Sequence, residues 1–214
     1  MRAFDELFAS GVATQGDNQN GKGDFFNDLL AVLLENCSGK LLHSRPDVPG
    51  YSFTTHKLDL AYPAAGKVLL TIETKATGAP KNPRNPKQKH LGGRAGSADL
   101  DKRIKEASFK NVDMKAAAAQ EEGLGGGPTS DLRAFLRHGR PHSYLFLSVR
   151  VRDEADLKKS IQFARIAAMW FEECGLYCYG WNPEHSSYEP KLVPREIRMD
   201  VVLSGICTTL RNLP

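Results

Sequence analysis

The sequence has 214 residues, one quarter of which are charged, and its formal net charge is +4. This length suits one α/β domain with its own hydrophobic core, so folding requires neither disulfides nor a structural metal. No apolar run approaches the roughly 18 residues that a membrane-spanning helix needs. The N-terminal residues include acids and lack the apolar core of a secretory signal. We therefore expect a soluble, cytoplasmic protein.

The four cysteines are scattered and form no CxxC pair, so we expect all of them to be reduced. A zinc site built from Cys174, Cys178 and His185 is the alternative. Cys174 is expected to end a helix, and Cys178 lies in an apolar stretch. Both features favour buried core cysteines over metal ligands.

Residues 1–21 are expected to form a flexible lead-in, because residues 10–22 are polar and rich in glycine. Asp24 is then a suitable N-cap for a helix that continues to about Cys37. Apolar residues recur in this helix at three- and four-residue spacing, which predicts one broad buried face. They are Phe26, Leu29, Leu30, Leu33 and Leu34.

Three stretches typical of strands follow, at residues 40–44, 51–61 and 67–76. A short turn that contains proline and glycine joins the last two, which predicts an antiparallel hairpin. If this turn is tight, Asp59 lies opposite Leu70 on the neighbouring strand.

The rest of the chain alternates between helices and strands, after a segment at residues 77–98 whose prolines and glycines exclude both. A strand–helix–strand unit requires a right-handed crossover between parallel strands. The predicted elements are a helix at 98–119, a glycine hinge at 123–127, a short helix at 128–138, a strand at 142–151, a helix at 156–174, a strand at 176–181 and a further strand at 197–206.

This order predicts one α/β domain over residues 22–189, with a C-terminal strand or arm at residues 190–214. Its core has the order α-β-β-β-α-β, and the early hairpin joins the later parallel strands in one central mixed sheet flanked by helices.

Three residues of the predicted hairpin carry chemistry. Glu73 and Lys75 are two apart in a strand, so their side chains share a face, with Thr74 on the other side. Asp59 lies in the first strand, within an apolar stretch. Carboxylates bind hard cations through oxygen, and such cations activate water for phosphodiester hydrolysis. A nearby ammonium can orient the attacking water.

A glutamate and a lysine two residues apart also occur as a solvated surface pair worth less than about 1 kcal/mol. Here, however, the strand before them is strongly apolar, and a second carboxylate lies in the neighbouring apolar strand. Two carboxylates near the centre of a sheet are costly unless a cation compensates them. This setting favours a functional site.

These residues and the predicted strand order resemble the PD-(D/E)XK nuclease superfamily, the fold of many type II restriction endonucleases. The likeness consists of Asp59, thirteen residues that include a hairpin turn, and then Glu73-Thr74-Lys75. It implies that Asp59 and Glu73 bind Mg²⁺, that the Thr74 carbonyl joins them, and that Lys75 positions the attacking water. The proline that usually precedes the aspartate is replaced by Leu58.

Many members of this superfamily also have an acidic residue in the first helix. The corresponding stretch here places Asn27 at the expected glutamate position, with Asp28 beside it. Glu35, two turns further along, is another candidate ligand. For all three, a helix cap or a solvated helix face is the alternative interpretation.

The segment at residues 77–98 is basic and contains no acid, which suits contacts with DNA phosphates. A disordered, solubilising loop is the alternative. In the following helix, Arg103 and Lys110 are either phosphate contacts or ordinary surface residues. The predicted DNA-binding residues are Lys81, Arg84, Lys87, Lys89, Arg94 and Arg103.

The resemblance implies an Mg²⁺-dependent endonuclease that cuts double-stranded DNA, in the first instance a sequence-specific type II restriction enzyme. Cutting both strands of a palindrome calls for two-fold symmetry, so we expect a homodimer and a cognate DNA methyltransferase. The alternatives are a repair, junction-resolving or modification-dependent nuclease of the same fold, or a non-catalytic DNA-binding module. A small-molecule enzyme is disfavoured, because no nucleotide-binding glycine fingerprint is present.

Overall fold

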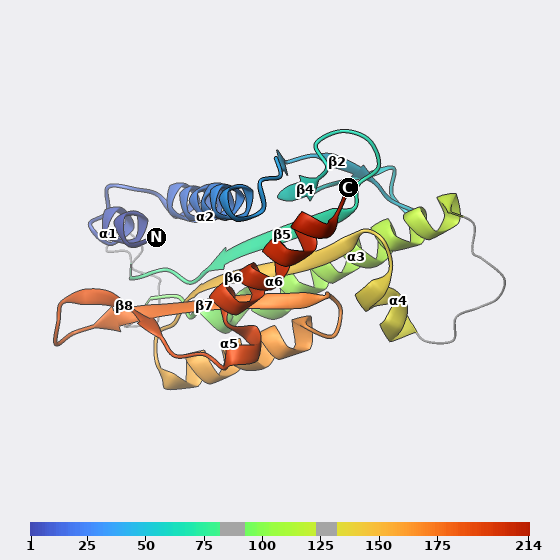
Figure 1. Ribbon diagram of the computed structural model, residues 1–214. Coiled ribbons are helices and arrows are strands. Elements are labelled where there is room, and N and C mark those ends of the chain that lie inside the picture. Colours follow the sequence, from blue (N-terminus) through green and yellow to red (C-terminus); the bar gives the residue numbers. More distant parts are fainter. Residues whose placement is uncertain (82–92, 123–131) are drawn as a thin grey trace.

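The computed structural model describes residues 1–81, 93–122 and 132–214, and a six-stranded sheet lies at their centre (Figure 1). In space its strands follow the order β1 (His43–Ser44), β4 (Leu60–Tyr62), β5 (Leu70–Thr77), β6 (His142–Arg150), β7 (Glu173–Asn182) and β8 (Ser187–Lys191).

The helices are α1 (Arg2–Ala9), α2 (Gln15–Ser38), α3 (Leu100–Glu121), α4 (Leu132–His138), α5 (Glu154–Ala167) and α6 (Met199–Asn212). Two short strands, β2 (Asp47–Pro49) and β3 (Thr55–Lys57), form a separate antiparallel pair. Single 3-10 turns occupy Gly96–Asp99 and Arg195–Ile197.

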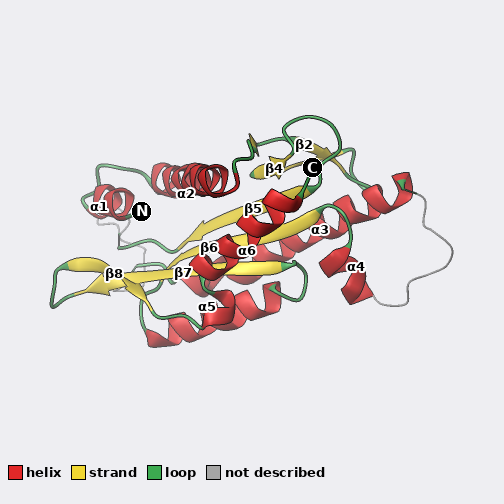
Figure 2. Cartoon of the chain, viewed as in Figure 1, coloured by secondary structure: helices red, strands yellow, loops and turns green. Residues whose placement is uncertain are grey.

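The sheet is mixed. Strands β5, β6 and β7 are parallel, whereas β4 pairs with β5 and β8 pairs with β7 in the antiparallel sense. Helices cover both of its faces, and β6 and β7 are largely apolar on both sides (Figure 2). The predicted α/β class, with a mixed sheet between helices, is confirmed.

Each face of the sheet has its own hydrophobic core. On one face, α2 and α6 pack against β4, β5 and β6 through residues such as Leu30, Ile72 and Ile206. On the other face, α3 and α5 pack against β6 and β7 through residues such as Ile104 and Leu147. The alternation in β5 therefore directs Leu70 and Ile72 to the first face, and Thr71, Glu73 and Lys75 to the second.

The predicted flexible lead-in at residues 1–21 is wrong. These residues form α1 and the start of α2, and Asp24 lies within α2 rather than at its N-cap. Thr14 caps α2 instead, because its hydroxyl accepts the Asp17 N–H and the Asp17 carboxylate accepts the Thr14 N–H.

The predicted strand at residues 51–61 is also wrong in part, because the chain bends between β3 and β4. Leu58 turns into a small core with Val48 and Met114, and Asp59 lies at the bend. The antiparallel hairpin of β4 and β5 is confirmed. Strand β1 covers only the end of the predicted strand at 40–44.

Two predictions in the C-terminal third are wrong. Helix α5 ends at Ala167, and Cys174 belongs to β7 rather than to the end of a helix. The predicted strand at residues 197–206, and with it the C-terminal strand or arm, is helix α6. Its branched apolar residues, which favour strands locally, are buried at helical spacing, as Val202, Ile206 and Leu210 show.

The expectation of four reduced cysteines is wrong as well, since a disulfide joins Cys37 at the end of α2 to Cys207 in α6. Cys174 and Cys178 are free and lie in the core between β7 and α5, as expected of core residues. His185, the third ligand of the alternative zinc site, pairs with Glu189 near the surface.

Candidate active site

The hairpin of β4 and β5 brings Asp59 beside Thr74. Leu60 pairs with Ile72 and Tyr62 with Leu70, so the predicted pairing of Asp59 with Leu70 is wrong. The connection between the two strands spans residues 63–69 and is not a tight turn. Asp59 therefore lies beside Thr74 rather than opposite Leu70. Oδ2 of Asp59 accepts hydrogen bonds from the Thr74 amide, at 2.7 Å, and the Thr74 hydroxyl, at 3.1 Å.

Lys75 links the two carboxylates. Its Nζ donates to Glu73 Oε2 at 2.7 Å and to the Thr74 carbonyl at 2.9 Å, and it lies 3.4 Å from Asp59 Oδ2. Glu73 and Lys75 thus share a face of β5, as their spacing predicts. Both carboxylates therefore have an oxygen within 3.4 Å of the same ammonium nitrogen.

A second ammonium, from Lys110 in α3, also contacts Glu73. Its Nζ lies 3.1 Å from Oε1 and 3.3 Å from Oε2, and it donates to the Lys57 carbonyl at 2.8 Å. The sequence predicts a phosphate contact or a surface position for Lys110, and it does not predict this contact with Glu73. One signal was present: Lys110 is three residues after Ala107 and four before Met114, which are both buried.

The carboxylates keep Lys75 in its charged form. Burial lowers the pKa of the Lys75 ammonium, but the charges of Glu73 and Asp59 outweigh burial and raise the pKa above its usual value. At neutral pH, Lys75 is therefore a hydrogen-bond donor and a positive charge. This state suits orientation of a water molecule and stabilisation of negative charge.

Beside Asp59 the surface forms an open, polar hollow of about 500 Å³. Asp24 of α2 contributes a second carboxylate and pairs with the Arg45 guanidinium. The backbone places Arg45 here, because the Arg45 N–H donates to the Asp59 carbonyl at 2.9 Å. The lining residues are Asn20, Asp24, Arg45, Lys57, Leu58 and Asp59.

None of the three candidate ligands predicted in the first helix lines this hollow. Asn27 is buried beneath the site, where its amide donates to the Ser44 hydroxyl and the Asp59 carbonyl. Asp28 is exposed on α2. Glu35 accepts the Leu42 N–H at 2.8 Å. Asp24, which the sequence predicts as a helix cap, is the acid of α2 that lines the hollow.

The residues at this site fit a magnesium ion better than a metal that is coordinated entirely by protein side chains. Within residues 1–81, 93–122 and 132–214, no three His, Cys, Asp or Glu side chains are grouped to hold a metal. Magnesium, however, is usually held by one or two carboxylates together with water and substrate phosphate. Asp59 and Glu73 supply two carboxylates, and among the described residues every hydrogen bond to the Asp59 carboxylate ends on Oδ2.

The predicted DNA-binding residues are only partly within the described chain. Lys81 is exposed, Arg94 pairs with Asp99, and Arg103 is exposed and donates to Glu106 at 3.1 Å. The backbones of Ala79 and Arg94 are hydrogen-bonded to each other, so the described residues at the two ends of the basic segment lie side by side. Arg84, Lys87 and Lys89, like the predicted glycine hinge at 123–127, lie outside the described residues.

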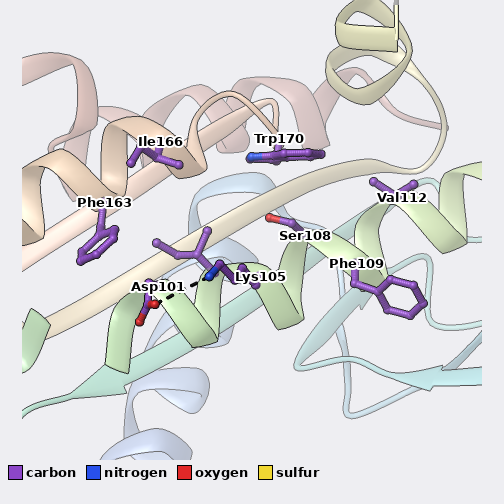
Figure 3. Close-up of a pocket in the computed structure, with 9 residues that line it drawn as sticks. Asp101, Lys105, Ser108, Phe109, Val112, Phe163, Ile166 and Trp170 are labelled. Carbon is purple, nitrogen blue, oxygen red and sulfur yellow. Dashed lines mark ion pairs between the residues drawn. The ribbon is translucent and has the colours of Figure 1, made fainter. Parts of the chain in front are cut away.

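A larger groove, of about 660 Å³, lies between α3 and α5 (Figure 3). Phe163, Ile166 and Trp170 line one side, and Phe109 and Val112 lie on the other. Its ion pair, between Asp101 and Lys105 at 3.8 Å, lies on the surface of α3. This groove brings together no set of catalytic groups, whereas the smaller hollow contains Asp59 itself.

Comparison with known proteins yields no match: no family model, no curated protein and no solved structure is similar to this chain. Among the described helices, none combines the length and apolarity needed to span a bilayer.

Proposed function

We propose that this protein is an Mg²⁺-dependent endonuclease that hydrolyses phosphodiester bonds of double-stranded DNA with a restriction-endonuclease-like core. The observation that carries the proposal is that the Lys75 ammonium contacts the carboxylates of both Asp59 and Glu73, and that Asp59 lines an open polar hollow. The sheet order and the antiparallel hairpin that bears these residues are in keeping with that core.

Asp59, Glu73 and the Thr74 carbonyl would hold the metal. Bound Mg²⁺ supplies an activated water and stabilises the leaving oxygen. Lys75 keeps its proton, so its ammonium would orient the attacking water and offset the negative charge that develops on the phosphorane. Asp24 adds a further carboxylate to the lining of the hollow.

Two cations of the hollow are suited to the DNA phosphate. Arg45 offers a planar, bidentate donor set, and Lys57 offers a flexible point charge. The basic residues at 77–98, which follow β5 in the sequence, would add contacts with the flanking phosphates. Phosphate binding would require Arg45 to exchange its Asp24 partner for the substrate.

Within this activity, we propose the task of a type II restriction enzyme. Cleavage of both strands at a palindrome needs two active sites related by a two-fold axis, which a homodimer provides. A host that contains such an enzyme would protect its own DNA with a methyltransferase of the same specificity.

Incubation of the purified protein with plasmid and Mg²⁺ tests the proposal. We expect discrete fragments, and we expect Asp59→Asn and Lys75→Met to lower the cleavage rate at least about 10²-fold. Lys102→Met is the matched control, because Lys102 is exposed on α3 and only approaches Glu106 at 4.0 Å. Structure-dependent or modification-dependent products would reassign the task, and no cleavage with Mg²⁺ or Mn²⁺ would refute the nuclease activity.

A further inference from the structure

Both carboxylate oxygens of Glu73 are occupied by lysine ammonium groups. Lys110 contacts Oε1 and Oε2, and Lys75 donates to Oε2. Only 3% of the Glu73 side chain is exposed, so water can offer little alternative solvation. A cation that binds to Glu73 must therefore displace at least one ammonium.

Lys110 is the more readily displaced of the two. Lys75 has three acceptors, in Glu73, Asp59 and the Thr74 carbonyl, and 19% of its side chain is exposed. Among the residues that the structure describes, Lys110 has the Lys57 carbonyl as its one acceptor besides Glu73, and its side chain is 29% exposed. It also enters from α3, whereas Lys75 is fixed on the same strand as Glu73.

The charges at the site favour this exchange. Without a metal, the carboxylates of Asp59 and Glu73 are balanced by the ammonium groups of Lys75 and Lys110. A divalent cation between the carboxylates would leave an excess of positive charge if both ammonium groups remained. Withdrawal of Lys110 reduces this excess.

We infer that Lys110 is a resident counter-ion of Glu73 that competes with the divalent metal and is released when the metal binds. This inference rests on the proposed function, because it concerns the proposed metal site. Lys57, whose carbonyl holds Lys110, also lines the hollow beside Asp59. The released ammonium therefore lies at the border of the phosphate site, and metal binding and DNA binding reinforce each other.

Mn²⁺ binding without DNA, followed by calorimetry and by electron paramagnetic resonance, provides the first test. Removal of the competing charge in Lys110→Met should tighten Mn²⁺ binding about 10-fold, and Lys110→Arg should keep the wild-type affinity. Lys110→Gln, which retains a hydrogen-bond donor, serves if the methionine variant does not fold. Lys105→Met, an exposed position on the same helix, should leave the affinity unchanged.

Amine labelling of the unmodified protein, read by mass spectrometry, provides the second test. Mn²⁺ should increase the labelling of Lys110 but not that of Lys102 or Lys105. If the wild type binds Mn²⁺ but Lys110→Met and Lys110→Gln bind it no more tightly, the role of Lys110 is refuted and the metal site stands. If neither the wild type nor any variant binds Mn²⁺, the role of Lys110, the metal site and the proposed function are all refuted.

Discussion

Asp24 and Asn27 are one turn apart on α2 but lie in different surroundings. Asp24 is on the outer side, where its carboxylate pairs with Arg45 at the wall of the hollow. Asn27 points inward and supports the backbone at Asp59 and the Ser44 hydroxyl. A substitution at Asp24 should therefore change chemistry at the site, and one at Asn27 should change the packing beneath it.

We predict that Asp24→Asn lowers Mg²⁺-dependent DNA cleavage about 10- to 100-fold with little loss of stability, because the Asp24–Arg45 pair is exposed. The control variants are Asp28→Asn and Glu35→Gln, which change acids of the same helix that do not line the hollow. Cleavage rates and urea unfolding measured on the same preparations separate activity from stability. Equal cleavage by all three variants would remove Asp24 from the site.

At the scale of elements, α3 fixes the strand that leads to Asp59. Asp113, three residues after Lys110, accepts hydrogen bonds from the Ser52 and Phe53 amides and contacts His56 Nε2 at 2.8 Å. Lys110 meanwhile holds the Lys57 carbonyl. Both contacts tie β3 to α3, and β3 ends two residues before Asp59.

The Asp113 contacts predict a loss of stability in acid. Burial raises the pKa of Asp113, but hydrogen bonds from Ser52, His56 and Phe53 outweigh burial and lower the pKa to about 2. Because the folded-state pKa is depressed, the stabilisation is complete above the usual pKa near 4 and is lost as the pH falls towards 2.

Urea unfolding of Asp113→Asn from pH 7 to pH 2 measures this effect. The variant should be less stable than the wild type by about 1–3 kcal/mol at neutral pH, with the difference shrinking between about pH 4 and pH 2. Asp101→Asn, an exposed acid of the same helix, should differ from the wild type by less than about 1 kcal/mol throughout. A difference for Asp113→Asn that does not vary with pH would contradict the assignment.

At the scale of the whole molecule, a buried ionic cluster joins α1 and α2 to the far end of the sheet. Asp5 and Lys22 are buried and pair at 2.9 Å. The Tyr179 hydroxyl donates to Asp5 Oδ2 at 3.1 Å, and Arg150 Nε lies 4.0 Å from the same oxygen. Lys22 also donates to the Gly78 carbonyl at 2.7 Å, so the cluster anchors the chain where the basic segment begins.

Replacement of either partner of this cluster alone should be strongly destabilising. Asp5→Asn and Lys22→Met should each destabilise the protein by about 3–5 kcal/mol, because each leaves a buried charge without its partner. The double variant should lose clearly less than the sum of the two. Arg2→Ala, which breaks an exposed pair with Glu6 in the same helix, should cost less than about 1 kcal/mol. Additive losses in urea unfolding would show that the pair is not coupled.

Features that depend on neighbours along the chain can be predicted from the sequence. The alternation in β5 fixes Glu73 and Lys75 on one face, and the short connection between β4 and β5 fixes their antiparallel pairing. The apolar strands β6 and β7 and the helix α5 between them likewise predict a parallel pair whose faces are covered by helices. These are local properties, because backbone periodicity repeats over two to four residues.

The side chains that reach the candidate site from distant parts of the chain are apparent only in the fold. Lys110 reaches Glu73 across 37 positions of sequence, and Arg45 places its guanidinium on Asp24 across 21. The same applies to α1, held by Asp5 and Lys22, and to α6, whose branched residues form a helix because that helix packs on α2 and the sheet. Local propensity is weak beside burial and charge pairing between remote segments, so the spacing along β5 singles out Glu73 and Lys75, whereas the contacts of Asp24 and Lys110 become apparent only in the fold.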